Sequence, residues 1–300
     1  MKCSHCSAEA VVFLPYADRH LCEQHFLRMF DKRVRTAVRQ HSMIKKGEKV
    51  AVGLSGGKDS CVLLHCLHDL QKDLPFELVA VTIDEGIKGY RAETLKTAKA
   101  ECKKLGIELL TLSFKEEAGK TLDSIVKNKE LPCSYCGVIR RYLLNKGAKM
   151  AEADKLATGH NLDDIGQTVM MNLMRNEPAR LARFLSHSSN EGMVPRIRPL
   201  MKTPEKEIAI YAMLKGIDIS HVECPYAHAA FRTQVRKILN DTEERHPGTK
   251  FKVVNSFLEI EDALKEKYAK AEYSICRKCG EPCSSQECKF CSMVGEGTKK

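Results

Sequence analysis

The sequence VAVGLSGGKDSC at residues 50–61 constrains the fold of this chain more than any other stretch. Its first part, residues 50–54, is a short apolar run with β-branched residues, which predicts a buried parallel strand. Residues 55–57 form a turn with little side-chain bulk, and a helical pattern starts at Asp59. Such a unit directs free backbone N–H groups and the positive end of a helix dipole at one point. It therefore predicts a phosphate site in an α/β protein.

Two common phosphate-binding motifs do not match this turn. The Walker A motif has Ser or Thr directly after its Lys, whereas here Asp59 follows Lys58, and the spacing is not the Rossmann G-x-G-x-x-G. The hexapeptide SGGKDS instead resembles the PP-loop of the N-type ATP pyrophosphatases, which split ATP into an adenylate and pyrophosphate. The alternative is a plain glycine turn between a strand and a helix.

Strand and helix patterns alternate along the rest of the central region. Three further apolar runs have the length of buried strands: residues 78–83, 108–112 and 155–158. The alternation predicts an α/β fold with a doubly wound parallel sheet and right-handed crossovers. Ligands of such folds bind at the carboxyl ends of the strands. We therefore expect one crevice to be lined by the small, polar loops at residues 53–60, 83–86 and 159–164.

Size and composition fit one sizeable domain with small appendages. Three hundred residues, 43% of them hydrophobic, describe an ordinary soluble globular chain. No apolar run approaches the roughly 18 residues of a membrane span, and the start, MKCSHC, lacks an apolar signal region. We therefore expect a cytoplasmic protein without membrane contact. The net charge of +10 fits a polyanionic partner such as RNA, and it equally fits a generally basic surface.

The fourteen cysteines indicate metal or redox chemistry, because disulfides are rare in cytosolic proteins. Near the start, a C-x-x-C pair and a C-x-x-H pair are separated by a short loop, which predicts a tetrahedral zinc site. Its expected ligands are Cys3, Cys6, Cys22 and His25. Four protein ligands close a site to chemistry, so its role is structural. His5 and His20 are competing ligands, and unpaired reduced thiols are the alternative.

A second zinc site is predicted at the end of the chain. Two C-x-x-C pairs a few residues apart form a compact zinc ribbon, with Cys276, Cys279, Cys288 and Cys291 as ligands. Cys283 is an alternative ligand. The expected organisation is an N-terminal zinc finger, a catalytic domain and a C-terminal zinc ribbon, at residues 1–30, 31–272 and 273–300. A basic helix at residues 28–49 is expected to lead into the catalytic domain.

Three cysteines of the central region stand apart from these pairs. Cys133 and Cys136 form a C-x-x-C just before a helix expected at residues 138–150, which carries Arg140 near its start. A helix N-terminus and a nearby arginine lower the pKa of a thiol. Cys224 lies far along the chain, in the sequence ECPY. On spacing alone, a buried thiol or a redox pair explains these residues equally well.

Taken in order, the motifs SGGKDS, PCSYC, GHNLDD and ECPY and the flanking zinc patterns are similar to one family over nearly the whole chain. The chain resembles the tRNA 2-thiouridine synthetases of the archaeal and eukaryal cytoplasmic type and their thermophile T-loop relatives. In that family, ATP adenylates the C2 oxygen of a tRNA uridine, and sulfur then replaces this oxygen. The resemblance implies that Cys133, Cys136 and Cys224 hold a [4Fe–4S] cluster with one iron left open. It also implies a homodimer.

The resemblance further implies which residues serve the nucleotide. The backbone amides of the turn and Lys58 would hold the phosphates and offset their charge. Asp59 and Asp164 would carry Mg²⁺, which prefers oxygen ligands. The full set expected to contact ATP is Gly53, Leu54, Ser55, Gly56, Gly57, Lys58, Asp59, Ser60, Ile83, Arg140, Gly159 and Asp164. Lys58, Asp59 and the three central cysteines are the expected catalytic residues.

Several alternatives stay open at this point. The wobble uridine is the preferred target and the T-loop uridine the alternative; the sulfur donor is free sulfide or the thiocarboxylate of a ubiquitin-like carrier. A persulfide on Cys133 or Cys224, with the other thiol resolving a disulfide, would need no cluster. An RNA-binding adaptor with an inactive nucleotide site is a different class of function. A PP-loop amidase or synthetase would not need the three central cysteines.

Overall fold

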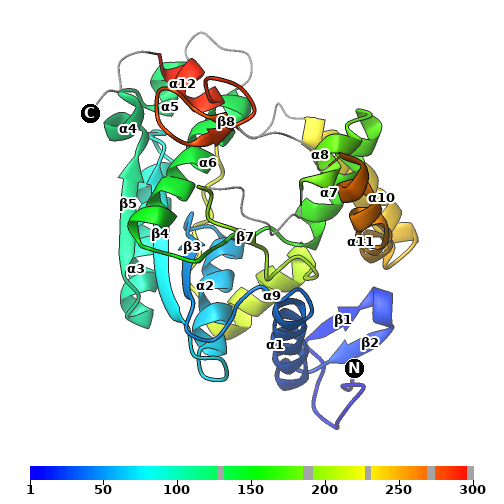
Figure 1. The fold of residues 1–300 in the computed structure, drawn as a ribbon. Helices are drawn as coiled ribbons and strands as arrows, with labels where there is room; N and C mark the ends of the chain where they lie inside the picture. Colours follow the sequence, from blue (N-terminus) through cyan, green and yellow to red (C-terminus); the bar gives the residue numbers. More distant parts are fainter. Residues whose placement is uncertain (127–131, 185–191, 227–230, 269–273, 296–300) are drawn as a thin grey trace.

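A five-stranded parallel sheet, with strand order β5-β4-β3-β6-β7, forms the centre of the protein (Figure 1). The computed structural model describes residues 1–126, 132–184, 192–226, 231–268 and 274–295. The strands are β3 (Lys49–Gly53), β4 (Glu77–Asp84), β5 (Leu109–Ser113), β6 (Lys155–Ala157) and β7 (Arg196–Ile197). The chain runs outward from β3 to β5 and then returns to β6 on the other side of β3. The predicted doubly wound α/β sheet is confirmed, and its order reverses between β3 and β6.

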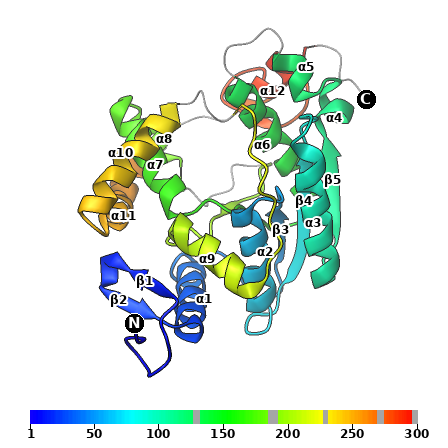
Figure 2. The ribbon, with the colours of Figure 1, turned by 180° about the vertical axis from the view of Figure 1, so that it is seen from behind.

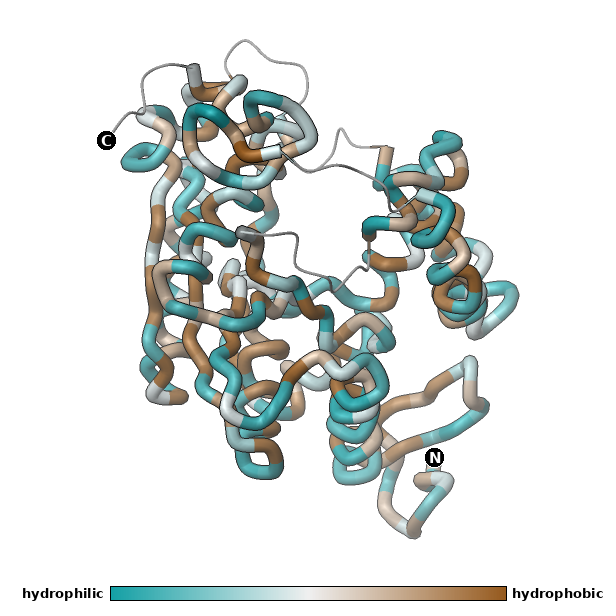
Figure 3. Tube along the Cα trace, in the orientation of Figure 1, coloured by the Kyte–Doolittle hydropathy of each residue, from teal (hydrophilic) through white to brown (hydrophobic). Residues whose placement is uncertain are grey.

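Helices cover both faces of this sheet. Successive strand residues point to opposite faces, and accordingly Val52 belongs to one apolar core and Ala51 to another. The first core contains side chains of α2 (Lys58–Leu70) and α3 (Arg91–Leu105), and the second contains those of α6 (Pro132–Met150). Figure 3 shows brown, apolar stretches along the central strands, as expected for strands buried on both faces.

The structure corrects the bounds of two predicted helices and adds one strand. The basic helix expected at residues 28–49 is α1 (Glu23–Gln40), and the backbone leaves the helix near Ser42, whose φ is +46°. The helix expected at residues 138–150 begins earlier, because Pro132 suits the first turn of a helix. The strand β7 was not predicted, since two residues, one of them an arginine, carry no apolar pattern.

A group of helices extends beside the sheet (Figure 1). It consists of α7 (Leu162–Met174), α8 (Pro178–Ala182), α10 (Phe231–Arg245) and α11 (Thr249–Tyr268), which pack on one another. The first of these, α7, starts a few residues after β6, so the group begins at the carboxyl end of that strand. A further helix, α9 (Glu205–Lys215), packs on α1 and α2. None of the helices in the described ranges is both long enough and apolar enough to span a bilayer.

Two small cysteine-rich modules lie at opposite ends of the molecule in both views (Figures 1 and 2). The N-terminal module contains the hairpin of β1 (Val12–Leu14) and β2 (Arg19–Leu21), joined by η1 (Pro15–Ala17), and leads into α1. The C-terminal module contains β8 (Ser274–Ile275), β9 (Pro282–Cys283) and α12 (Lys289–Val294), which packs on α6. Two short helices, α4 (Phe114–Ala118) and α5 (Leu122–Val126), follow β5.

Candidate functional site

The SGGKDS turn wraps closely around the start of α2. Gly57 caps this helix, and the Ser60 hydroxyl donates a hydrogen bond to the Gly57 carbonyl at 3.0 Å. The same hydroxyl oxygen accepts a hydrogen bond from the Ser55 amide at 3.1 Å. Gly53 ends β3, and the amide of Leu54 donates to the Val81 carbonyl of β4 at 2.8 Å. A compact turn at a helix N-terminus is the arrangement that binds phosphate.

Only glycine fits at position 56 of this turn. Its φ is +86°, and a Cβ atom there would lie 2.0 Å from the carbonyl oxygen of Thr94, at the start of α3. The turn is therefore pressed against α3 as well as against α2.

Gly56→Ala is expected to destabilise the protein and to weaken ATP binding. Gly47→Ala is a matched control, because Gly47 has a φ of +81° but no atom lies within 4 Å of the position that its Cβ would occupy. Both variants incur the roughly 1–2 kcal/mol cost of alanine in a left-handed conformation. Gly56→Ala should lose a further 1–3 kcal/mol or so of unfolding free energy from the overlap with Thr94. Urea denaturation and ATP titration measure both effects, and equal losses in the two variants would contradict this account.

The loop after β6 meets the loop after β3. A Cβ atom on Gly159 would lie only 3.0 Å from the backbone of Asp59, so the two loops approach as closely as glycine permits. The side-chain amide of Asn161 donates a hydrogen bond to Asp59 Oδ1 at 3.1 Å. Asn161 also caps α7 together with Asp164 in a reciprocal capping box. Two of the three loops expected to share a crevice therefore come together where the strand order reverses.

Charged side chains gather at this junction. Lys58 Nζ lies 3.0 Å from Asp59 Oδ2 and 2.7 Å from Glu205 Oε1. Burial raises the pKa of Asp164 to about 6, and the charge of Asp59 adds to this rise. Burial also raises the pKa of Asp59. A divalent cation bound here would favour the ionised form of both carboxyl groups.

The acidic side chains do not converge on one point as the ligands of a fully protein-bound ion do. Within the described ranges, the groups whose ligand atoms all lie within 4.8 Å of one another are the two cysteine-rich sets and no acidic set. Mg²⁺ commonly uses one or two carboxylates and completes its shell with water and substrate phosphates. Asp59 and Asp164 fit that pattern.

Sequence reasoning missed an ion pair that joins the loop after β4 to the first residue of α3. Arg91 Nε lies 3.0 Å from Glu85 Oε2, and both side chains are buried. An Arg91 Nη1 donor also reaches the carbonyl of Ser55 at 2.7 Å, so this arginine supports the turn. Ile83 is buried at the end of β4. The available signal was an acidic residue directly after a buried strand and an arginine six residues later.

Arg140 lies on the other side of Glu85. Its Nη1 atom is 3.9 Å from Glu85 Oε1, and half of its side chain is exposed. It follows Cys136 by one helical turn of α6, and a contact with phosphate stays a prediction. Glu85 thus stands between the arginine that supports the SGGKDS turn and the helix that carries two of the central cysteines.

The segment around Cys224 lies against the start of α6. The thiol of Cys133 donates a hydrogen bond to the carbonyl of Tyr226 at 3.3 Å, two residues beyond Cys224. The charges of Cys133 and Cys224 both act on the thiol of Cys136. The three cysteines, which are distant in sequence, are therefore neighbours in the fold.

The expectation of a lowered thiol pKa is wrong for Cys136. Burial raises the pKa of Cys136 to about 11, although Arg140 acts in the opposite direction. Burial likewise raises the pKa of Cys224. The loss of water around a thiolate outweighs the attraction of one arginine, so burial decides the direction of both pKa shifts.

The segment that leads to Cys224 also contacts the SGGKDS turn. The amide of Ser220 donates a hydrogen bond to the carbonyl of Gly56 at 3.2 Å. Cys224 follows Ser220 by four positions, and an extended chain spans at most about 14 Å over four positions. A nucleotide on the turn and a sulfur at the cysteines would therefore share one crevice.

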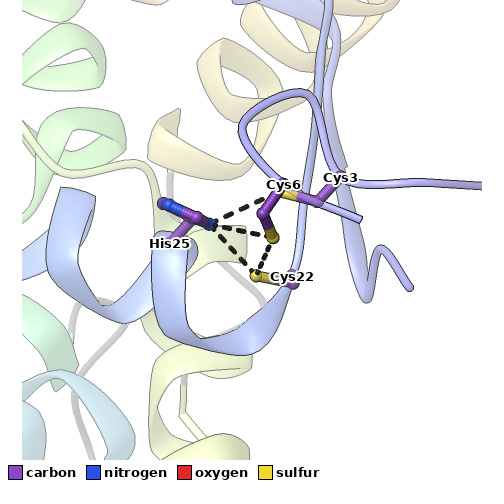
Figure 4. Close-up of side chains that lie close together, drawn as sticks. All are labelled: Cys3, Cys6, Cys22 and His25. Carbon is purple, nitrogen blue, oxygen red and sulfur yellow. Dashed lines mark hydrogen bonds between the residues drawn. The ribbon is translucent and has the colours of Figure 1, made fainter. Parts of the chain in front are cut away.

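Each terminal module holds a group of four metal-binding side chains whose ligand atoms all lie within 4.8 Å of one another. In the N-terminal group the sulfurs of Cys6 and Cys22 are 3.8 Å apart, and Cys22 Sγ is 3.2 Å from His25 Nδ1 (Figure 4). In the C-terminal group the sulfurs of Cys279 and Cys288 are 3.6 Å apart. A tetrahedral zinc ion with Zn–S bonds of about 2.3 Å places its sulfur ligands about 3.8 Å apart.

These two groups contain the eight residues that the sequence predicted as ligands: Cys3, Cys6, Cys22 and His25, and Cys276, Cys279, Cys288 and Cys291. The competing ligands His5, His20 and Cys283 belong to neither group. The three central cysteines form no such tight group within the described residues. Their arrangement therefore differs from that of the two terminal groups.

Family models match two parts of the chain. A PP-loop domain model matches residues 24–243, and a model described as the N-terminal LIM domain of the 2-thiouridine synthetase TtuA matches residues 2–27.

Curated relatives match almost the whole chain. A probable sulfurtransferase of Methanocaldococcus jannaschii is 39% identical over 98% of this chain and 87% of the relative. The tRNA 2-thiolation protein NcsA of Haloferax volcanii is 35% identical over 98% of each chain. The tRNA-5-methyluridine(54) 2-sulfurtransferase of Pyrococcus horikoshii is 34% identical over 98% of this chain and 94% of the relative.

A solved structure shares the fold over its full extent. The U34-tRNA thiolase NcsA of Methanococcus maripaludis, determined with its [4Fe–4S] cluster, superposes with a TM-score of 0.86 at 35% identity. The match covers 98% of this chain and 95% of that chain.

Proposed function

Because this chain belongs to the tRNA 2-thiolation proteins, the ATP-dependent sulfurtransferases of the PP-loop family, we propose that it replaces the C2 oxygen of a tRNA uridine with sulfur. The observation that carries the proposal is that residues 220–226 contact both the SGGKDS turn and the start of α6. Ser220 of this segment donates a hydrogen bond to the SGGKDS turn, and the carbonyl of Tyr226 accepts one from Cys133. Its course supports an adenylating site that lies beside a sulfur site.

The first half of the reaction uses the turn. The C2 oxygen of uridine attacks the α-phosphorus of ATP, and pyrophosphate leaves. Lys58 and the amides of residues 55–60 offset the charge that builds on the phosphates. Asp59 and Asp164 would hold Mg²⁺, and the backbone of Gly53, Leu54 and Ile83 would border the nucleotide. Gly159 leaves room for its close approach.

The second half exchanges oxygen for sulfur. A sulfur nucleophile adds to C2, and the adenylated oxygen leaves as AMP. Three cysteine thiolates suit an iron–sulfur cluster, and Cys133, Cys136 and Cys224 would hold a [4Fe–4S] cluster here. When bound, such a cluster would supply an iron that holds the incoming sulfur. Cys136 and Cys224 are half-buried, whereas Cys133 is exposed.

We propose the wobble uridine as the target. The relative with the solved structure is named a U34-tRNA thiolase, and several curated relatives are named cytoplasmic tRNA 2-thiolation protein 1. The Pyrococcus relative, at a similar identity, is named for position 54, which makes the T-loop uridine the second candidate. The names of the eukaryal relatives also support a cytoplasmic location.

The proposal includes further components. Zinc is the metal that suits both terminal groups of ligands. Sulfide or a ubiquitin-like thiocarboxylate carrier supplies the sulfur, and two copies of the chain form a homodimer.

The experiment is thiolation of unmodified tRNA by anaerobically purified protein with MgATP and sulfide. Nucleoside mass spectrometry after site-specific cleavage should locate one 2-thiouridine at the wobble position. A sulfur at position 54 would replace the wobble assignment, and no ATP-dependent 2-thiouridine at either position would overturn the proposal. A brown protein with broad visible absorption supports the cluster. A colourless protein that is active with persulfide and without iron supports the persulfide alternative.

A further inference from the structure

The helix α6 connects the central cysteines to the C-terminal module. Cys133 and Cys136 occupy its first turns, and Tyr142 follows Cys136 by about 9 Å along the helix axis. The ring of Tyr142 stacks on the ring of Phe290, with the centroids 3.8 Å apart and the planes 5° from parallel. Phe290 belongs to α12 of the module and is buried.

Glu281 of the module holds α6 at a second place. Its carboxylate accepts a hydrogen bond from Asn145 Nδ2 at 2.8 Å and also pairs with Lys149. Asn145 is buried, and its Oδ1 atom accepts a hydrogen bond from the Val194 amide at 2.9 Å. This one amide side chain therefore joins the module, α6 and the segment that leads into β7.

The two terminal modules belong to different apolar cores. Phe290 and the C-terminal ligands share one core with Ile139 and Leu143 of α6, and Cys136 and Cys224 pack against that core. The N-terminal ligands Cys3 and Cys22 belong to the other core. Loss of one metal site should therefore leave the surroundings of the other unchanged.

We propose that the C-terminal module, folded around its metal, positions the sulfur site by holding α6 through Phe290 and Glu281. The inference rests on the proposed function, because it takes Cys133 and Cys136 as cluster ligands. The module's described part spans residues 274–295, which is too short to fold on an apolar core alone. Its four ligands therefore fix the surface that docks on α6. Tyr142, Asn145, Phe290 and Glu281 are positioning residues in this account.

The test compares four variants of the full-length protein. Cys279→Ser removes the C-terminal metal, and Phe290→Ala uncouples a metal-loaded module from α6. Phe290→Tyr retains the stacked ring and should restore the wild-type behaviour. Cys6→Ser is the matched control, because it removes a metal ligand from the other core. The readouts are zinc content, amide hydrogen exchange of residues 132–141 without iron, and the iron content and visible absorption after anaerobic reconstitution.

We expect Phe290→Ala to keep both zinc ions, to exchange about tenfold faster across residues 132–141, and to retain less than half of the wild-type iron. Cys279→Ser should show the same changes with one zinc lost, whereas Cys6→Ser should lose one zinc and keep wild-type exchange and iron. If Phe290→Ala shows the wild-type exchange rate and the wild-type iron content, the proposal is overturned, regardless of the result for Cys279→Ser. A further outcome separates the two proposals. If the wild type binds no iron but Phe290→Ala still speeds hydrogen exchange across residues 132–141, the module positions α6 and the cluster assignment is wrong.

Discussion

Asp59→Asn is expected to lower the rate of tRNA thiolation by roughly 10²–10³-fold, the usual effect of removing one preorganised electrostatic contact. The asparagine has the same shape, and its single oxygen can keep one of the two hydrogen bonds that the Asp59 carboxylate accepts from Lys58 and Asn161, so the turn should remain folded. The lost charge removes one of the two carboxylates proposed to hold Mg²⁺, which would otherwise neutralise the phosphates. Single-turnover thiolation and MgATP titration measure the effect.

Asp69→Asn is the matched control for this variant. Asp69 is in the last turn of the same helix and pairs with Lys72 and Lys215 at the surface, so its replacement should leave thiolation within about twofold. Full thiolation by Asp59→Asn would contradict the assignment of the turn. If Asp59→Asn binds tRNA as tightly as the wild type but no longer thiolates it, the adaptor interpretation is excluded, since an adaptor does not need a working nucleotide site.

Cys224→Ala is expected to abolish detectable thiolation and to remove most of the bound iron. Replacing a residue that only supports a metal ligand typically costs roughly 10–100-fold in metal affinity or activity, and the loss of a ligand itself should exceed that. Cys224 is also the one proposed ligand from outside α6, so no neighbouring cysteine of that helix can take its place. Iron analysis, visible absorption and nucleoside mass spectrometry check the result.

Cys102→Ala is the control for this second variant. Cys102 is buried in α3 and packs in the core that also contains Cys61 and Cys66. Its loss should cost about 1 kcal/mol of stability, leaving iron and thiolation unchanged. A Cys224→Ala protein that keeps its iron and its activity would rule out Cys224 as a ligand.

Local patterns in the sequence were enough to predict the elements that depend on near neighbours. The apolar run, the small turn and the helical pattern around SGGKDS predict β3, the turn and α2, because backbone geometry is set mainly by adjacent residues. The two terminal ligand groups are predictable for the same reason. Within each pair, the spacing of two residues brings both ligand atoms to one point before any tertiary contact forms.

The tertiary structure decided the features that depend on burial and on distant charges. A raised thiol pKa at Cys136 follows from packing that no local pattern encodes, and it reverses the effect expected from Arg140. The burial of the ion pair of Glu85 and Arg91 and the docking of Phe290 on Tyr142 likewise depend on elements that meet only after folding. Desolvation and electrostatic fields depend on everything within several ångströms, and only the folded chain determines which groups those are.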